Sequence, residues 1–292
     1  MSRFAYVNGS YERHAQAMVS IDDRGYQFAD GVYEVVAISN GYPVDLAPHM
    51  VRLERSMAAL HFAATPYKSA LGVIAKQVVR LNRVRNGILY MQINRGTAAR
   101  NHLFPSEETG PSIVMTSRSG LGPTEVQAEQ GVHLAMLEDQ RWGRRDIKSV
   151  GLLANALAKQ KAKDKGAYEA LLVNPDGTVT EASAANIWLV DGEGALVTRP
   201  LGTDILAGIT RARVIALAQE AGYAVKEKVF TVDEALSARE IFLTGTTTFV
   251  LPVVQVDDAV IGNGHPGEAG RDLRYRYRAF LEDLGPESWH VD

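Results

Sequence analysis

The feature that most constrains this chain is the polar stretch TSRSGLGPTEVQ at residues 116–127. Serine, glycine and proline collect there between two apolar segments, which is typical of a linker or a long loop. The chain has 292 residues, enough for two domains of ordinary size. We therefore predict a small N-terminal domain at 1–119, a linker at 120–127 and a larger C-terminal domain at 128–292.

The N-terminal part mixes strands with helices. Apolar runs predict strands at residues 4–7, 32–39, 87–96 and 111–118. Apolar residues at helical spacing predict helices at residues 49–63 and 69–84. This mixture predicts a domain of the α+β or α/β class.

The C-terminal part is richer in strands. Strand patterns occur at residues 132–140, 168–175, 186–192, 194–200, 224–230 and 240–256. The tetrapeptide NPDG (174–177) has the composition of a hairpin turn. Helical patterns intervene at 149–165, 208–222 and 268–284. We predict a barrel-like domain decorated with helices.

The first of these helical patterns raises a question about its start. Ser149 can act as the N-cap, and the apolar stripe is formed by Leu152, Leu153, Ala156 and Leu157. Lys148 stands just before this cap and does not belong to the pattern.

The composition excludes several classes of function. A net charge of -3 and a pI near 6.2 predict neither nucleic acid nor an anionic membrane as a partner. No apolar run is long enough to cross a bilayer, and the first residues lack the apolar core of a signal peptide. The chain has no cysteine, and its seven histidines show no paired ligand spacing, so we expect no metal site. We expect a cytoplasmic protein.

Lys148 has two interpretations. Most lysines are solvated surface charges, and residue type alone favours that interpretation. A lysine beside apolar groups is instead harder to protonate, so its pKa falls and it becomes a nucleophile able to form a Schiff base. If such a lysine holds pyridoxal phosphate, the ring nitrogen requires an acidic partner. The phosphate requires backbone N–H groups at a helix N-terminus and an arginine.

Candidates for these partners occur elsewhere in the chain. Glu181 ends a strand among small residues, although an exposed turn glutamate is the simpler interpretation. Ile209 and Thr210 open a helix after Gly208, where the helix dipole is positive, but ordinary helix starts are common. The GTTT turn at 245–248 could present N–H and hydroxyl groups to an anion, or could merely reverse the chain. Arg52 is one of many candidate arginines and could equally be a solvated helix charge.

These motifs together resemble a known family. The chain is similar to the fold-type IV pyridoxal-phosphate enzymes, and within them to the D-amino acid aminotransferases, from about residue 4 to residue 284. The matching stretches are DRGYQFADGVYEVV (23–36), HMVRLERS (49–56), NRGTAARNHLFP (94–105), RWGRRDIKS (141–149), ALAKQKAKDKGAYEALL (156–172), VTEASAAN (179–186), GITR (208–211) and TGTTT (244–248).

The resemblance implies a fold, a cofactor and a set of roles. The fold would have a small N-terminal α/β domain and a larger pseudo-barrel domain that binds pyridoxal 5'-phosphate. Lys148 would form the Schiff base with the cofactor, and Glu181 would pair with its ring nitrogen. The phosphate would be held by Arg52, Ile209, Thr210 and Thr246, and Leu206 would lie against the ring. In the family such an enzyme transfers an amino group between a D-amino acid, such as D-alanine, and a 2-oxo acid, such as 2-oxoglutarate or pyruvate.

The loop sequence R-N-H indicates the subclass. Arg100 and His102 could be solvated, which is the usual state of charged residues in a loop. The resemblance instead implies that they form, with Tyr33, a trap for the substrate carboxylate, and that Thr247 also contacts the substrate. A guanidinium can bind a carboxylate through two hydrogen bonds. In the family the arginine and histidine reach across a homodimer interface, so a homodimer with shared active sites is implied.

The chain also departs from the family pattern. Serines common after the glutamate are replaced by Ala184 and Ala185, which leaves Ser183 as the local hydroxyl, and Gly245 stands where a serine is common. The alternatives are transamination of branched-chain L-amino acids or (R)-amines, aminodeoxychorismate lyase, and a non-catalytic scaffold, which is expected to lose Lys148 or Glu181.

Overall fold

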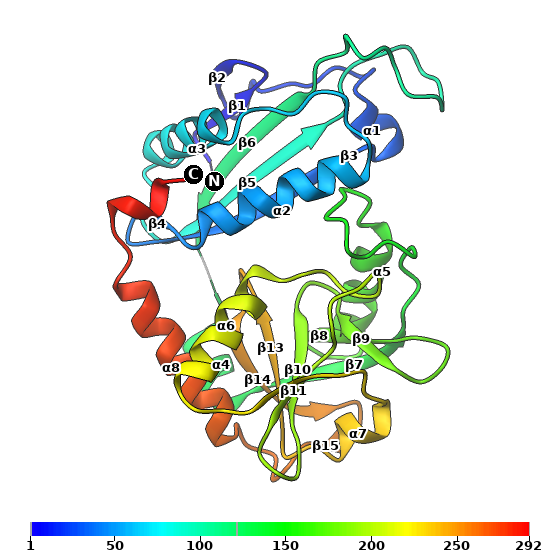
Figure 1. Cartoon of the computed structure of the whole chain (residues 1–292), viewed down its shortest axis with the longest axis vertical. Coiled ribbons are helices and arrows are strands. Elements are labelled where there is room, and N and C mark those ends of the chain that lie inside the picture. Colours follow the sequence, from blue (N-terminus) through cyan, green and yellow to red (C-terminus); the bar gives the residue numbers. More distant parts are fainter. Residues whose placement is uncertain (1, 121, 292) are drawn as a thin grey trace. The chain divides into compact units, whose positions relative to one another are not determined.

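The chain divides into two compact units (Figure 1). The computed structural model describes residues 2–120 and 122–291. Unit 1 comprises Met1–Leu121, Ile147–Gly151 and Leu281–Asp292, and unit 2 comprises Gly122–Asp146 and Leu152–Phe280. The linear division into domains does not anticipate the short return of residues 147–151 to unit 1, and this return carries Lys148.

Unit 1 is built on a six-stranded sheet with the order β2-β1-β6-β5-β3-β4. Its strands are β1 Phe4–Val7, β2 Ser10–Arg13, β3 Gly31–Ser39, β4 Tyr42–Pro43, β5 Gly87–Asn94 and β6 Ser112–Ser119. Neighbouring strands in this sheet run antiparallel. Because successive residues of a strand point to opposite faces, Val32 and Val36 of β3 enter the core whereas Tyr33 points to the other face.

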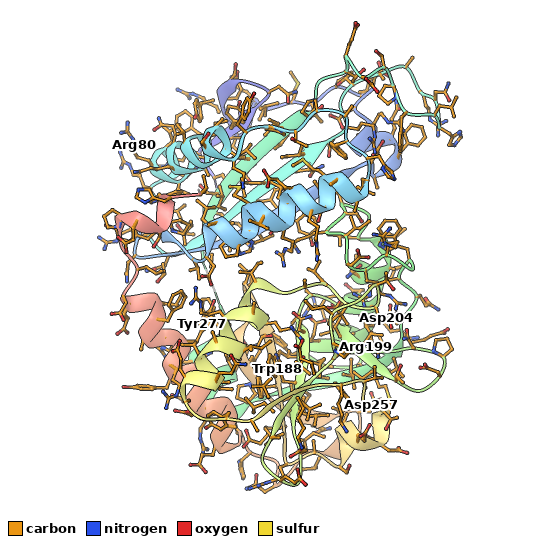
Figure 2. The ribbon with its side chains drawn as sticks, viewed as in Figure 1. Arg80, Trp188, Arg199, Asp204, Asp257 and Tyr277 are labelled. Atoms are coloured by element: carbon orange, nitrogen blue, oxygen red, sulfur yellow. The ribbon has the colours of Figure 1, made fainter. Side chains whose placement is uncertain are left out.

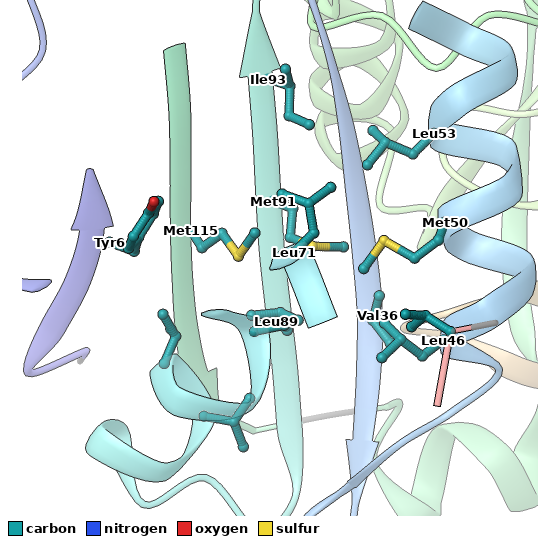
Figure 3. Packing of buried hydrophobic residues seen from close by; sticks show 14 of the residues in the cluster. Tyr6, Val36, Leu46, Met50, Leu53, Leu71, Leu89, Met91, Ile93 and Met115 are labelled. Carbon is teal, nitrogen blue, oxygen red and sulfur yellow. The ribbon is translucent and has the colours of Figure 1, made fainter. Parts of the chain in front are cut away.

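Helices cover one face of this sheet (Figure 1). They are α2 Leu46–Ala59 and α3 Lys68–Asn82, while the short α1 Arg24–Phe28 precedes β3 and the 3-10 turn η1 Pro286–Trp289 lies near the C-terminus. Figure 3 shows Met50 and Leu53 of α2 packed toward Val36 and Met91 of the sheet. Each of these four side chains is at most 1% exposed, so α2 is fixed to β3 along its length.

Unit 2 is built on a nine-stranded sheet with the order β12-β11-β10-β13-β14-β7-β8-β9, with β15 paired to β14. Its strands are β7 Val132–Glu138, β8 Glu169–Val173, β9 Val179–Ala182, β10 Asn186–Val190, β11 Leu196–Thr198, β12 Val225–Glu227, β13 Glu240–Gly245, β14 Phe249–Val256 and β15 Ala259–Val260. The pairs β14–β7, β7–β8 and β11–β12 are parallel, and the other pairs are antiparallel.

Five helices accompany the sheet of unit 2 in the described part of the chain. They are α4 Glu125–Gln130, α5 Leu153–Asp164, α6 Ile209–Glu220, α7 Val232–Leu236 and α8 Glu268–Glu282. Helix α5 packs against β7 and β8, and α6 packs against β12 and β13. The second half of the predicted linker is therefore helical: α4 begins after Thr124, whose side chain forms a capping box with Gln127.

Many of the predicted elements are confirmed. The strand at Phe4–Val7 and the helices near 49–63, 69–84, 208–222 and 268–284 are present, with ends shifted by a few residues. NPDG forms the β8–β9 turn, in which Gly177 has a φ of +82° and donates to the Asn174 carbonyl at 3.0 Å. Across residues 2–120 and 122–291, no helix has the length and hydrophobicity needed to cross a membrane.

The prediction that Ser149 caps a helix is wrong. Helix α5 begins at Leu153, and its N-cap residue, Leu152, makes no side-chain capping bond. Ser149 instead forms a β-bridge with Val32 and lies four residues before the first residue of the helix. The predicted apolar stripe is also not buried in the single chain, because Leu153 is 75% exposed and Leu157 is 62% exposed.

Candidate active site

Lys148 is held on strand β3 by backbone hydrogen bonds. The Tyr33 N–H donates to the Lys148 carbonyl at 3.0 Å, and the Val150 N–H donates to the Gly31 carbonyl at 3.0 Å. The Lys148 N–H also donates to the Ser56 hydroxyl of α2 at 3.3 Å. The Lys148 Nζ lies 4.2 Å from the centre of the Tyr33 ring, and among the described residues no carboxylate forms an ion pair with it. The structure thus brings two predicted site residues into direct contact.

Arg52 is buried beside a glutamate and is not a solvated helix charge. Its Nε donates to Oε1 of Glu34 at 2.8 Å, and its Nη2 donates to Oε2 at 2.6 Å. His49, one turn earlier on α2, lies 2.7 Å from the same carboxylate through Nδ1. Arg52 is linked to Lys148 through α2, since Ser56 lies one turn after Arg52 and accepts the Lys148 N–H.

The electrostatics of this cluster fix the charge of each group. Burial by itself raises the pKa of Glu34, but the charge of Arg52 and the hydrogen bonds from Arg52 and His49 outweigh it and lower that pKa to about 2. Burial lowers the pKa of His49, and the charges of Arg52 and Lys148 act in the same direction against the opposing effect of Glu34. The carboxylate is therefore ionised and the imidazole is favoured as neutral at pH 7.

Glu181 lies on β9 in unit 2, and it is 4% exposed. Its Oε1 accepts from Nη1 of Arg141 at 2.5 Å, and its Oε2 accepts from Nδ2 of Asn186 at 2.9 Å. The Leu206 N–H donates to both oxygens at 3.2 Å. The exposed turn glutamate that was the simpler interpretation is therefore wrong: this carboxylate is buried and bound on several sides.

The pKa of Glu181 reflects two opposed effects. Burial raises the pKa of Glu181, and the neighbouring Arg141 charge and the Leu206 N–H lower it only in part, so the net direction is upward. Arg141 also binds Asp139 through Nε at 2.9 Å and Nη2 at 2.7 Å, so one guanidinium serves two acids. A second cationic donor on Glu181 would therefore stabilise its ionised form.

Asn186 links Glu181 to the residues that lead into helix α6. Its Nδ2 also donates to the Leu206 carbonyl at 3.0 Å. A Cβ at Gly208 would overlap the Asn186 side chain, so only glycine fits at this N-cap position. Gly208 provides no capping side chain, and the first N–H groups of α6, at Ile209 and Thr210, are left for another acceptor. The Leu206 N–H thus binds the Glu181 carboxylate, and the chain reaches the first residues of α6, Ile209 and Thr210, three and four residues later.

The loop that carries Leu206 is anchored by an ion pair between Arg199 and Asp204, two of the residues labelled in Figure 2. Nη2 of Arg199 lies 2.5 Å from the Asp204 carboxylate, and its Nη1 donates to the Val179 carbonyl of β9 at 2.8 Å. Arg199 is 7% exposed. This buried guanidinium therefore ties the loop before Leu206 to the strand that carries Glu181.

The β13–β14 turn lies next to the chain that follows Glu181. A Cβ at Gly245 would meet the Ala184 carbonyl at 3.3 Å, and the Thr248 N–H donates to the Gly245 carbonyl at 3.1 Å. Thr246 is partly buried and Thr247 is exposed in this turn. Ser183, expected to remain as the local hydroxyl, instead donates to the buried Glu169 carboxylate.

Arg100 and His102 are not brought to the other predicted residues. Both are exposed in the loop between β5 and β6, next to Phe28 of α1. The Arg100 guanidinium carbon lies 5.0 Å from the centre of the Phe28 ring, and the His102 ring centre lies 5.5 Å from it. Among the described residues neither forms a hydrogen bond, an ion pair or a ring contact with Tyr33 or Lys148.

Several residues that organise these clusters were not among the site residues predicted from the sequence. Glu34 had a signal, since it is the one charged residue in the apolar pattern of residues 31–39. His49, Arg141 and Asn186 had no comparable signal, because their roles depend on contacts made across the fold. No group of three or more His, Cys, Asp or Glu residues suited to a metal ion occurs within 2–120 and 122–291.

The family of this chain follows from comparisons with known proteins. A model of the family described as "Amino-transferase class IV" matches residues 31–256. The chain therefore belongs to the class IV aminotransferases, and the resemblance seen in its motifs is confirmed.

Curated relatives extend the match over nearly the whole chain. The D-alanine aminotransferase of Bacillus licheniformis is 40% identical over 271 residues, which cover 91% of this chain and 93% of that protein. The D-alanine aminotransferase of Staphylococcus aureus (strain MSSA476) is 35% identical over 277 residues, 95% of this chain and 97% of that protein.

Solved structures confirm the predicted fold class. The T.th. branched-chain amino acid aminotransferase with pyridoxamine 5'-phosphate has a TM-score of 0.91 and 26% identity, over 100% of this chain and 99% of that chain. The Escherichia coli branched-chain enzyme has a TM-score of 0.91 over 100% of both chains at 23% identity, and it shows the fold alone.

Proposed function

We propose that this protein is a pyridoxal-phosphate-dependent D-amino acid aminotransferase. It transfers an amino group between a D-amino acid such as D-alanine and a 2-oxo acid such as 2-oxoglutarate or pyruvate. The observation that carries the proposal is a lysine amine that lies on a tyrosine ring without a carboxylate partner among the described residues. Relatives named D-alanine aminotransferases, which match more than nine-tenths of this chain, support the substrate class.

The residues present fit the cofactor. When bound, pyridoxal phosphate supplies an aldehyde that condenses with amines and a protonated ring that accepts the electron pair released at the substrate Cα. Glu181 is suited to the ring nitrogen, because it is a buried carboxylate held in place by Arg141, Asn186 and the Leu206 N–H. A cationic ring N–H would also offset the burial that raises the pKa of Glu181.

The phosphate is assigned to the start of α6. The N–H groups of Ile209 and Thr210 lie at the positive end of the helix, where Gly208 leaves them uncapped by a side chain. Thr246 adds a hydroxyl, and Arg52 adds a guanidinium whose orientation is fixed by Glu34. In this assignment Leu206, whose backbone is bound to Glu181, lies against the ring.

Lys148 has two tasks in the proposed reaction. It would hold the cofactor, and its amine, when free, would take the proton from the substrate Cα as a general base. The position of that amine is set by the β3 backbone bonds and by the Tyr33 ring. The protein therefore brings one nucleophile to a defined place, and the stereochemistry follows from the face at which it acts.

The substrate carboxylate is assigned to Arg100 and His102 with Tyr33, and Thr247 completes the substrate contacts. Because Arg100 and His102 do not contact Tyr33 among the described residues of one chain, we assign them to the site of a second copy in a homodimer. Exposed apolar side chains favour such an association. In unit 1, Met18, Ile21, Tyr26 and Leu103 are 74–82% exposed, and Leu153 of α5 in unit 2 is 75% exposed.

Mixed dimers test the shared site. Lys148→Ala and Arg100→Ala chains are each expected to be impaired at low D-alanine concentration, for different reasons. After the two variants are unfolded and refolded together, half of the sites in a mixed dimer have neither defect if Arg100 acts on the partner's Lys148. Recovery of activity supports the homodimer, whereas a mixture no more active than its components contradicts it.

A spectrum tests the substrate class. The holoenzyme is expected to show the yellow absorbance of the lysine-bound cofactor, which D-alanine bleaches and L-leucine leaves unchanged. The solved branched-chain aminotransferases favour one alternative, transamination of branched-chain L-amino acids. Bleaching by L-leucine instead of D-alanine supports that alternative.

We expect the protein to act in the cytoplasm.

A further inference from the structure

The loop between β5 and β6, residues 95–111, has no helix or regular strand, yet part of its backbone is firmly held. Its side chains at Arg100 and His102 are exposed. Long loops without secondary structure are uncommon in compact domains and are frequently functional. The contacts that hold this loop come from a cluster of buried charges that the proposed reaction does not otherwise use.

Arg24 of α1 binds the loop on both sides of His102. Its Nη1 donates to the Asn101 carbonyl at 2.6 Å and to the Leu103 carbonyl at 3.2 Å. The Asn101 side chain closes the same turn, because its Oδ1 accepts the Leu103 N–H at 3.0 Å. The peptide that carries His102 is therefore held at both flanking carbonyls by one guanidinium.

The Arg24 guanidinium is itself held by Asp30. Nε of Arg24 donates to Oδ2 of Asp30 at 2.7 Å, and Nε of Arg95 donates to the same oxygen at 2.8 Å. The side chains of Arg24, Asp30 and Arg95 are 5%, 11% and 8% exposed. Little water competes for these charge-assisted hydrogen bonds, so their geometry is well defined.

Arg95 anchors the cluster to the end of helix α2. Its Nη2 donates to the Leu60 carbonyl at 2.7 Å, and its Nη1 donates to the His61 carbonyl at 2.9 Å. Its guanidinium carbon also lies 3.8 Å from the centre of the Phe104 ring, which belongs to the loop. The loop is thus connected through two arginines and one aspartate to the body of unit 1.

Phe28 connects this cluster to the exposed side chains. The Arg24 guanidinium carbon lies 4.8 Å from the centre of its ring, and the Arg100 guanidinium carbon lies 5.0 Å from the same centre. The His102 ring is 5.5 Å away. One aromatic ring therefore contacts the anchoring arginine and both residues assigned to the substrate carboxylate.

From these contacts we infer that Arg24 is a positioning residue for substrate binding: through Asp30 and the carbonyls of Asn101 and Leu103 it sets the orientation of Arg100 and His102. This inference rests on the proposed function and adds a specificity-determining residue to it. Arg24 does not touch the substrate carboxylate. Because Arg24 already holds the loop in place, less conformational entropy is lost when the loop binds the carboxylate.

The test compares Arg24→Gln and Arg24→Lys holoenzymes with the unmodified holoenzyme. Arg24→Gln is expected to raise the KM for D-alanine by about tenfold or more and to change kcat by less than about threefold. Arg24→Lys retains the charge but not the fork of donors, so its KM is expected to be intermediate. The amide hydrogens of residues 97–105 are expected to exchange faster in Arg24→Gln. A fall in kcat with an unchanged KM and an unchanged rate of amide hydrogen exchange overturns the inference.

A matched control separates this role from general damage. Arg274 of α8 also donates from Nη1 to a backbone carbonyl, that of Val250 at 3.0 Å, on an element that carries no predicted site residue. Arg274→Gln is expected to leave the KM for D-alanine unchanged. An equal rise in KM for Arg274→Gln overturns the inference.

Coupling to Arg100 separates failure of the inference from failure of the proposed function. In an Arg100→Ala background, Arg24→Gln is expected to raise KM by less than about threefold, because its main target is gone. If Arg100→Ala alone leaves KM unchanged, the carboxylate trap is wrong and the inference falls with it. If Arg100→Ala raises KM but Arg24→Gln does not, only the inference is overturned.

Discussion

Replacement of Glu34 by glutamine tests the electrostatic cluster on which Arg52 depends. Glu34 is fully buried, and the pKa of its carboxyl falls from an ordinary value of 4.5 to about 2. Each tenfold change in proton affinity corresponds to about 1.4 kcal/mol, so the ionised carboxylate contributes about 3 kcal/mol to stability at pH 7. Glu34→Gln is expected to lower the free energy of unfolding by about that amount, at the lower end of the range for a broken buried ion pair.

The measurement is urea unfolding of protein freed of cofactor, which removes any contribution from cofactor binding to the folded state. Glu54→Gln is the control, because Glu54 lies on α2, the helix that carries Arg52, and its ion pair is at the surface. The Glu54 side chain is 41% exposed and lies 3.3 Å from Lys68, so its removal is expected to cost less than about 1 kcal/mol. If Glu34→Gln is no more destabilising than Glu54→Gln, the account of this cluster is wrong.

The pH dependence gives a second check with a defined sign. A carboxyl whose folded pKa is lowered stabilises the protein above its unfolded pKa, and that stability is lost as the pH falls toward the folded pKa. The difference in unfolding free energy between the protein that retains Glu34 and its Glu34→Gln variant should therefore narrow as the pH falls below about 4.5. Both proteins carry His49→Gln in this series, because buried His49 has a lowered pKa and would add its own dependence below its ordinary value of 6.5. A difference that stays constant in acid refutes the reasoning.

Three further predictions concern the proposed cofactor residues. Lys148→Ala is expected to abolish transamination and the yellow absorbance, and turnover above a trace would contradict its assigned role. Arg141→Gln removes the main cation beside Glu181, so the pKa of Glu181 should rise further; cofactor affinity measured by titration is expected to fall at least about tenfold, most strongly at low pH. Gly208→Ala is expected to displace Asn186, which its Cβ would overlap, and to weaken cofactor binding by about tenfold or more, as measured by the same titration; unchanged affinity would show that Asn186 does not position Glu181.

The order of elements and their types could be read largely from local spacing. Apolar runs in residues 32–39 and 87–96 and helical spacing in 49–63 and 69–84 identify elements of unit 1 that the structure contains. The failure at Ser149 has a clear physical cause. A serine before an apolar stripe is a good local helix signal, but the long-range bridge to Val32 holds this residue on strand β3, and the helix begins only at Leu153.

Residue chemistry could indicate candidates but not their surroundings. Lys148 and Glu181 were selected for what an amine and a carboxylate can do, and the motifs around them identified the family. Their burial and partners were not readable, because Arg141 is separated from Glu181 by 40 residues and Arg52 from Glu34 by 18. The simpler interpretations of Glu181 and Arg52 as solvated charges failed for this reason.

The sequence by itself determined the alternation of strands and helices, the residue types able to hold the cofactor, and membership of the class IV aminotransferases. These properties follow from local periodicity and from motifs that are short in sequence. Only the tertiary structure decided that Lys148 returns to strand β3, that Glu34 binds Arg52, and that Arg24 holds the loop of Arg100 and His102. Such contacts depend on packing between segments distant in the chain, and burial then decides which charges remain ionised and which groups are held in place.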